Sequence, residues 1–202
     1  MRVVNIEECK NEFARDEIMW LVFQSAFVAR GRHPYYVYNQ KPEVSEKDKE
    51  DFKKDISKML IHVSTRDTSH IEKIKTLQVQ ISEKWKDVLF EHEKSRPPYL
   101  KNQTGGWFTF GRAQKLLNLY LKYQWVFNQP QSIDPPPHCP IDAIILREIK
   151  WLGPPWTSPE FTEEKYRKAI EHCEERAREE EKSLAVWELC VFNNRNKIID
   201  GK

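Results

Sequence analysis

The sequence predicts an all-α fold. Apolar side chains recur at intervals near 3.6 residues along most of the 202-residue chain, and the alternation typical of β-strands is almost absent. The chain is 39% hydrophobic and contains 7 Trp, 10 Phe and 7 Tyr, which is enough apolar surface for a core. We therefore expect a single helical domain over residues 1–202, divisible into two lobes, one of residues 1–95 with 155–202 and the other of residues 96–154.

The first half of the chain predicts three helices. Residues 11–30 are rich in aromatic side chains and end before a glycine, which is a common residue at a helix C-terminus. Ser45 and Ser69 are each followed three positions later by an acidic residue, so they predict capped helices over residues 45–62 and 69–93. The second of these carries an apolar stripe that we expect in the core: Ile71, Ile74, Leu77, Ile81, Trp85 and Val88.

The second half predicts three more helices. Residues 109–127 are mostly apolar, so we expect a central, buried helix whose polar face holds Lys115, Asn118 and Lys122. A proline-rich connection leads to a helix over residues 140–152, because proline suits the first helical position. Asp142 would then lie in its first turn. A final helix is predicted over residues 158–191, with a charged, solvent-facing middle.

Composition excludes several classes of function. The 33 Lys and Arg nearly balance 31 Asp and Glu, so any basic surface must be local. The 4 cysteines are widely spaced, which indicates reduced thiols of a cytoplasmic protein and no zinc site. No apolar run approaches the roughly 18 residues that cross a bilayer, and the glycine-rich motifs of nucleotide binding are absent. We expect a cytoplasmic monomer with no membrane contact, no metal, no nucleotide and no other cofactor.

Residues 104–146 carry a specific spacing. Gly111 precedes Lys115 by four residues, and the aspartate of Pro140-Ile141-Asp142 follows the lysine 27 residues later. This pattern resembles the helix-hairpin-helix DNA glycosylases, especially the archaeal branch of the 8-oxoguanine glycosylase group, to which phage-defence glycosylases are similar. Ala113 stands where these enzymes have a second glycine, and their upstream Leu-Pro-Gly is replaced by TGGWFTF. The resemblance therefore implies a two-lobed helical bundle with a degenerate hairpin.

The resemblance implies excision of a damaged or modified base by cleavage of the N-glycosidic bond. Lys115 would be the nucleophile that attacks the sugar and forms a Schiff base, and Asp142 would stabilise the positive charge that develops there. A lysine attacks only when its amine is neutral, which burial or a second cation such as Lys122 favours. Monofunctional and bifunctional chemistry both stay open at this point.

The substrate implied is duplex DNA with a modified base, which must leave the helix to reach an enzyme pocket. Aromatic side chains could stack on this base, and cations or free backbone N–H groups could hold the neighbouring phosphates. The predicted DNA- and base-binding residues are Gly111, Arg112, Trp107, Phe110, His138, Cys139, Lys101 and Tyr36.

Two other classes of function stay open. In a non-catalytic all-α module that binds protein or nucleic acid, residues 171–182 of the last helix would make the contact. Lys115 would then belong to a solvated helix face, and Asp142 would be an ordinary first-turn residue. His138 would be a loop histidine and Cys139 a buried thiol. A helical ribonuclease is less well supported, because RGRH, where the first helix ends, does not match the Arg-x(4–6)-His signature of such enzymes.

Overall fold

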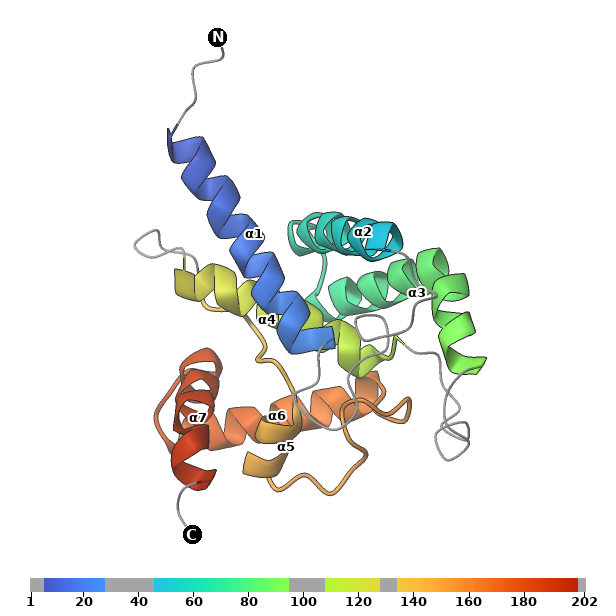
Figure 1. Ribbon diagram of the computed structural model, residues 1–202. Helices are drawn as coiled ribbons and strands as arrows, with labels where there is room; N and C mark the ends of the chain where they lie inside the picture. The colour runs from blue at the N-terminus through green and yellow to red at the C-terminus, as the bar shows by residue number, and fades with distance from the viewer. Residues whose placement is uncertain (1–5, 28–45, 95–107, 128–133, 200–202) are drawn as a thin grey trace.

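A computed structural model describes residues 6–27, 46–94, 108–127 and 134–199, and all regular secondary structure in these ranges is α-helix (Figure 1). The all-α prediction is confirmed. In chain order, the helices are α1 (Ile6–Phe27), α2 (Glu46–Ser64), α3 (His70–Lys94), α4 (Phe110–Phe127), α5 (Ala143–Glu148), α6 (Glu163–Glu179) and α7 (Leu184–Ile199).

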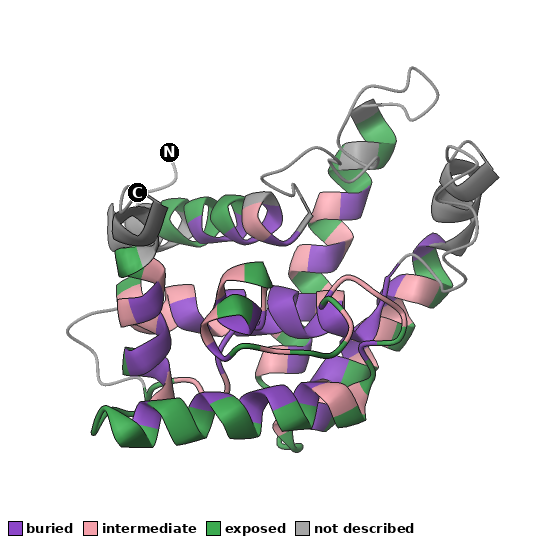
Figure 2. Cartoon of the chain, turned by 90° about the horizontal axis from the view of Figure 1, so that it is seen from below, coloured by how far each residue is buried: buried purple, intermediate pink, exposed green. Residues whose placement is uncertain are grey.

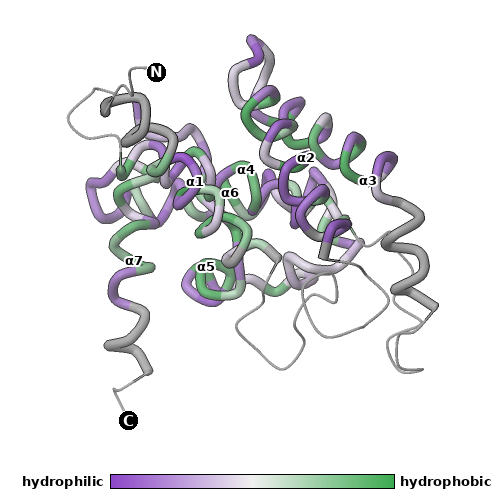
Figure 3. The backbone as a smooth tube through the Cα atoms, turned by 45° about the horizontal axis from the view of Figure 1, so that its top comes forward, coloured by the Kyte–Doolittle hydropathy of each residue, from purple (hydrophilic) through white to green (hydrophobic). Residues whose placement is uncertain are grey.

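Helix α4 packs against α1, α2 and α3, and α2 also packs on α3. Hydrophobic and hydrophilic segments alternate along α2 and α3 (Figure 3), as expected of helices with one buried face. The stripe predicted on α3 is confirmed as core for Ile71, Ile74, Leu77, Ile81 and Trp85, whereas the side chain of Val88 lies outside the described residues. Buried residues concentrate in the middle of the molecule (Figure 2).

Helix α7 packs against α5 and α6. The observed packing thus places α5, within residues 96–154, beside α7, and places α4 of the same segment among α1, α2 and α3. The division into lobes of residues 1–95 with 155–202 and residues 96–154 stays a prediction. Helix α4 is buried over most of its length, and α1, α2 and α3 all pack against it.

The prediction of one long helix over residues 158–191 is wrong, because α6 ends at Glu179 and α7 begins at Leu184. Glu181 adopts a left-handed φ of 54°. The N–H of Lys182 donates to the carbonyl of Ala177 at 2.9 Å, and that of Glu181 to Arg178 at 3.1 Å. These two bonds form a Schellman motif, which usually has glycine where this chain has Glu181.

Helix α5 ends in the same way and is therefore shorter than predicted. Lys150 has a φ of 52°, and the N–H of Trp151 donates to the carbonyl of Leu146 at 2.9 Å. The turn after α6 matters more for the site, because it folds α7 back so that Trp187 is fully buried. Glu188, the next residue, is thereby directed toward α4.

Candidate functional site

Lys115 and Asp142 lie side by side. The Nζ atom of Lys115, in the second turn of α4, is 3.4 Å from Oδ2 of Asp142. Their side chains are only 11% and 19% exposed. The interpretation of Lys115 as part of a solvated helix face is therefore wrong. An amine and a carboxylate that are 27 residues apart in sequence meet in a mostly buried setting.

The Asp142 carboxylate is held by the start of α5. Its Oδ1 atom accepts hydrogen bonds from the backbone N–H groups of Ile144 at 2.9 Å and Ile145 at 3.2 Å. Asp142 is thus the N-cap rather than a first-turn residue, and Pro140 precedes the helix. One carboxylate oxygen caps the helix and the other faces the amine, so the cap fixes the direction in which the negative charge points.

Trp156 covers the amine from another side. Its ring centroid lies 4.4 Å from Nζ of Lys115, within the range of a cation–π contact. Gly111, one turn before the lysine, makes this approach possible: a Cβ atom there would lie 1.8 Å from the carbonyl oxygen of Trp156. The glycine of the recognised spacing therefore has a packing role, since it admits the Trp156 backbone to the surface of α4.

A neutral amide network fastens residues 138–142 to α4. The side-chain NH₂ of Gln114 donates to the carbonyl of Ile141 at 2.7 Å, and the N–H of Ile141 donates back to Gln114 Oε1 at 3.1 Å. The amide nitrogen of Asn118 lies 3.0 Å from the carbonyl oxygen of Cys139. Both amides are fully buried. This network sets the position of Asp142 relative to Lys115.

A second ion pair lies two turns further along α4. The Nζ atom of Lys122 donates to both carboxylate oxygens of Glu188, at 2.9 and 2.6 Å, and the two side chains are 7% and 4% exposed. Burial raises the pKa of the Glu188 carboxyl, and the negative charge of Asp142 adds to this rise, while Lys122 opposes it. Sequence reasoning missed Glu188, because it assigned this segment to a continuous helix and no motif marks a partner 66 residues away.

Both ion pairs line one cavity of about 130 Å³, which we call the charged cavity. Its walls come from α1, α4, α7 and the turn before α5, and they are mainly apolar around the four charged groups. Such a combination is typical of sites for small organic groups. The lining residues are Ser25, Lys115, Leu119, Lys122, Tyr123, Val126, Phe127, Pro140, Asp142, Glu188, Leu189, Phe192 and Asn193.

His138 and Cys139, both predicted to bind DNA, do not line the charged cavity. Nδ1 of His138 lies 2.9 Å from the hydroxyl of Tyr166, and its ring packs on His70 with centroids 4.5 Å apart. Burial lowers the pKa of His138 to about 4. A hydrogen bond with Cys173, together with burial, raises the pKa of the Cys139 thiol well above its usual value. An uncharged thiol in the core is a poor nucleophile.

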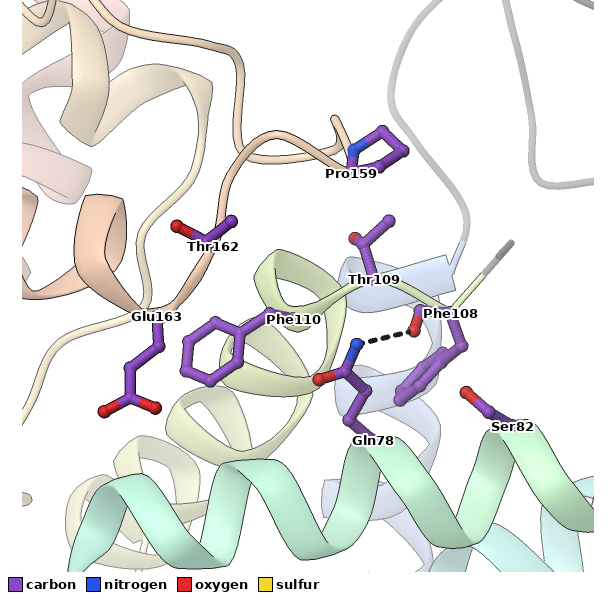
Figure 4. A pocket seen from close by; sticks show the side chains of 8 residues that line it. All are labelled: Gln78, Ser82, Phe108, Thr109, Phe110, Pro159, Thr162 and Glu163. Atoms are coloured by element: carbon purple, nitrogen blue, oxygen red, sulfur yellow. Dashed lines mark hydrogen bonds between the residues drawn. The ribbon is translucent and has the colours of Figure 1, made fainter. Parts of the chain in front are cut away.

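Phe110 lines a second cavity, of about 340 Å³, at the starts of α4 and α6 (Figure 4). It is buried and packs against the ring of Tyr166, with centroids 5.5 Å apart. Figure 4 shows that Gln78 of α3 faces the start of α4, where its side chain donates to the carbonyl of Phe108 at 3.4 Å. This cavity shares no lining residue with the charged cavity.

The remaining predicted DNA-binding residues either do not line the charged cavity or lie outside the described residues. Arg112 lies in the first turn of α4, and burial lowers the pKa of its guanidinium to about 9. Gly111 is buried against Trp156 and Phe161. Trp107, Lys101 and Tyr36 lie outside the described residues.

No protein-family model, curated protein or solved structure matches this chain. In the described part of the chain, no helix combines the length and apolarity needed to cross a membrane. Among the same residues, no three His, Cys, Asp or Glu side chains converge as metal ligands would. The chemistry of the charged cavity therefore decides which function we propose.

Proposed function

We propose that this chain is a DNA glycosylase that excises a damaged or modified base, with Lys115 as nucleophile and Asp142 as charge stabiliser. The observation that carries the proposal is the 3.4 Å separation of Lys115 Nζ and Asp142 Oδ2 in a shared cavity. In the helix-hairpin-helix glycosylases that this chain resembles, a lysine and an aspartate have these two tasks. The two-lobed arrangement and the degenerate hairpin belong to the same proposal.

The reaction begins when the ammonium of Lys115, which contacts Asp142 and Trp156, loses a proton to water and becomes a neutral amine. A bond forms between Nζ and the C1′ atom of the sugar while the bond from C1′ to the base nitrogen breaks. The electron pair of the broken bond leaves with the base, and the proton lost by Nζ reaches the base through water. Opening of the sugar ring then gives a Schiff base. Positive charge develops on the sugar during the first step, and the Asp142 carboxylate stabilises it.

The N-cap bonds favour this task for Asp142. Because Oδ1 is held by two backbone N–H groups, the carboxylate does not have to reorient when charge appears on the sugar. The substrate is duplex DNA in which one nucleotide is flipped so that its base enters the charged cavity. We propose that the protein acts as a cytoplasmic monomer without a cofactor.

Borohydride trapping tests the role of Lys115. The protein is incubated with duplexes that carry oxidised, deaminated, alkylated or phage-type modified bases, and reduction of the Schiff base should leave a covalent protein–DNA adduct. Lys115→Gln should abolish the adduct, because the amide has no nucleophilic lone pair. Lys168→Gln, which changes an exposed lysine of α6, is the matched control and should trap normally. The proposal would be contradicted if the unaltered protein released no base and trapped no duplex.

Base release, measured as abasic sites, tests the role of Asp142. Asp142→Asn should slow release by on the order of 10²-fold or more, because a dedicated charge stabiliser is lost. Asparagine is also a good N-cap, so α5 should remain folded, as circular dichroism can check. A release rate equal to that of the unaltered protein would remove Asp142 from the mechanism.

The alternative of a binding module that uses residues 171–182 has less support. Charged side chains in and beside this segment pair locally, as in Arg176–Glu179 at 2.8 Å and Lys182–Glu180 at 2.7 Å. Neutralised charges of this kind are expected of a solvated helix surface.

A further inference from the structure

The Lys122–Glu188 pair is poorly explained as a stabilising element. Removing two charges from water costs about as much as their attraction returns, so apolar residues of similar volume often serve a fold equally well or better. Yet this pair is almost fully buried and borders the charged cavity, where it could meet a ligand. A polar pair kept in an apolar wall is the arrangement by which a pocket recognises a polar group.

The placement of the pair suits the far edge of a base. Lys115 and Lys122 are seven residues apart on α4, a rise of about 10 Å. The two side chains start from backbone positions this far apart, so a base that reaches from a sugar carbon at Lys115 to a hydrogen bond with Lys122 is on the order of one ring long. One aromatic ring with its glycosidic bond fills that length.

The volume of the charged cavity agrees with this length. An engineered apolar cavity of about 150 Å³ takes up benzene, a single six-membered ring. The charged cavity, at about 130 Å³, is of the same size. A single ring therefore matches this volume better than the two fused rings of a purine do. Phe192, whose ring lies 4.7 Å from the Lys122 amine, offers an aromatic surface for stacking beside the ion pair.

We propose that the charged cavity takes a pyrimidine-type base and that Lys122 and Glu188 determine this specificity by contacting its polar edge. The ammonium group donates to a ring carbonyl or ring nitrogen, and a free lone pair of the carboxylate accepts from an exocyclic amino or ring N–H group. This inference rests on the proposed glycosylase function. It assigns substrate recognition to two residues outside the Lys115–Asp142 pair.

The test compares two reactions of the same protein. Base release is measured on duplexes that carry uracil, 5-hydroxyuracil or 5-hydroxymethylcytosine, and on duplexes that carry 8-oxoguanine or hypoxanthine. Borohydride trapping is measured separately on a duplex with a preformed abasic site, which has no base to recognise. The unaltered protein should release at least one of the pyrimidines and neither purine, and it should trap the abasic duplex.

The double variant Lys122→Met/Glu188→Leu removes both charges, so it leaves no unpaired charge in the core. Its release of pyrimidine should fall by on the order of 10²-fold or more, because a site built around polar contacts discriminates strongly through them. Its trapping of the abasic duplex should stay within about twofold of the unaltered protein, since the Lys115–Asp142 pair is intact. The matched control Lys168→Met/Glu164→Leu, which removes an exposed pair on α6, should change neither reaction.

Three results would overturn the inference. Release of a purine as fast as any pyrimidine would contradict the size limit. Unchanged pyrimidine release by the double variant, or an equal fall in release and trapping, would show that the pair does not read the base. These outcomes leave the proposed glycosylase activity intact. If the unaltered protein showed no trapping and no base release, both the proposed function and this inference would be overturned.

Discussion

Two adjoining faces of α4 treat their buried polar groups in opposite ways. On one face, the amides of Gln114 and Asn118 form neutral hydrogen bonds to backbone and side-chain partners. On the other face, Lys115 and Lys122 form ion pairs with Asp142 and Glu188. Only the charged face lines the cavity of about 130 Å³. The comparison teaches that the neutral face positions the chain, while the charged face is available for chemistry.

The buried amides of the neutral face bond to each other and to side chains of neighbouring segments. Oδ1 of Asn118 accepts from Nε2 of His70 at 2.7 Å, and the Asn118 amide nitrogen lies 2.9 Å from the Tyr166 hydroxyl. An amide nitrogen cannot accept a hydrogen bond, so the hydroxyl proton is available to Nδ1 of His138. A satisfied network of this kind specifies one arrangement of the segments that it joins, because breaking any bond strands a buried polar group.

The largest loss of stability should come from breaking the tighter ion pair. Lys122→Met leaves the Glu188 carboxylate buried without its cation, so the free energy of unfolding should fall by about 3–5 kcal/mol. Adding Glu188→Leu should restore most of this loss, since the double variant buries no lone charge. Denaturant titrations of the two variants measure both effects. A double variant less stable than Lys122→Met would mean that the pair stabilises the fold directly.

A substitution on the neutral face should lower the free energy of unfolding nearly as much. Asn118→Ala strands the carbonyl of Cys139 and the partners on His70 and Tyr166, so we expect a loss of about 3 kcal/mol in the free energy of unfolding. Base release should fall as well, because the segment that carries Asp142 is no longer fixed to α4. A variant that loses stability but releases bases normally would separate the network from the site.

The two faces should respond to pH with opposite signs. Burial lowers the pKa of both His70 and His138 to about 4, from 6.5 in an unfolded chain. The unfolded state therefore binds more protons between pH 6.5 and 4, and stability that is present above pH 6.5 is lost as the pH falls through this window. Each ring should contribute about 2 kcal/mol of loss between pH 6.5 and 5. Thermal melts across this range test the expectation, and His138→Gln should flatten the curve.

Glu188 makes the stability of the protein depend on pH with the opposite sign. Its pKa is raised in the folded protein, so its contribution to stability is present at low pH and lost as the pH rises through the folded value. The melting temperature of Lys122→Met/Glu188→Leu should therefore decline more steeply with acid than that of the unaltered protein. Parallel curves would contradict this assignment of the two signs.

The smallest effect on stability is expected at Lys115. In Lys115→Gln, Asp142 keeps the two backbone N–H groups that it caps and remains 19% exposed, so the free energy of unfolding should change by about 1 kcal/mol or less. Differential scanning calorimetry can compare this change with that of Lys122→Met. A loss as large as that of Lys122→Met would erase the distinction between the two pairs.

Much of the helical pattern could be predicted from sequence. The stripe from Ile71 to Trp85 repeats with the period of an α-helix, so its buried face follows from local geometry. The spacing of Lys115 and Asp142 marked two residues that the structure brings within 3.4 Å. The burial of Lys115 could not be predicted in this way, because a lysine on the one polar face of a helix is ordinarily solvated. Trp156, which covers it, belongs to a connection without periodicity.

The sequence by itself determined where most helices lie and which faces are apolar, because both depend on neighbours three and four residues apart. Tertiary structure alone decided that Glu181 takes a left-handed conformation without glycine, that α7 folds back on α6, and that Glu188 meets Lys122. These features depend on contacts between residues far apart in the chain. The burial of Trp187, gained only when α7 packs, accompanies a backbone conformation that the local sequence does not favour.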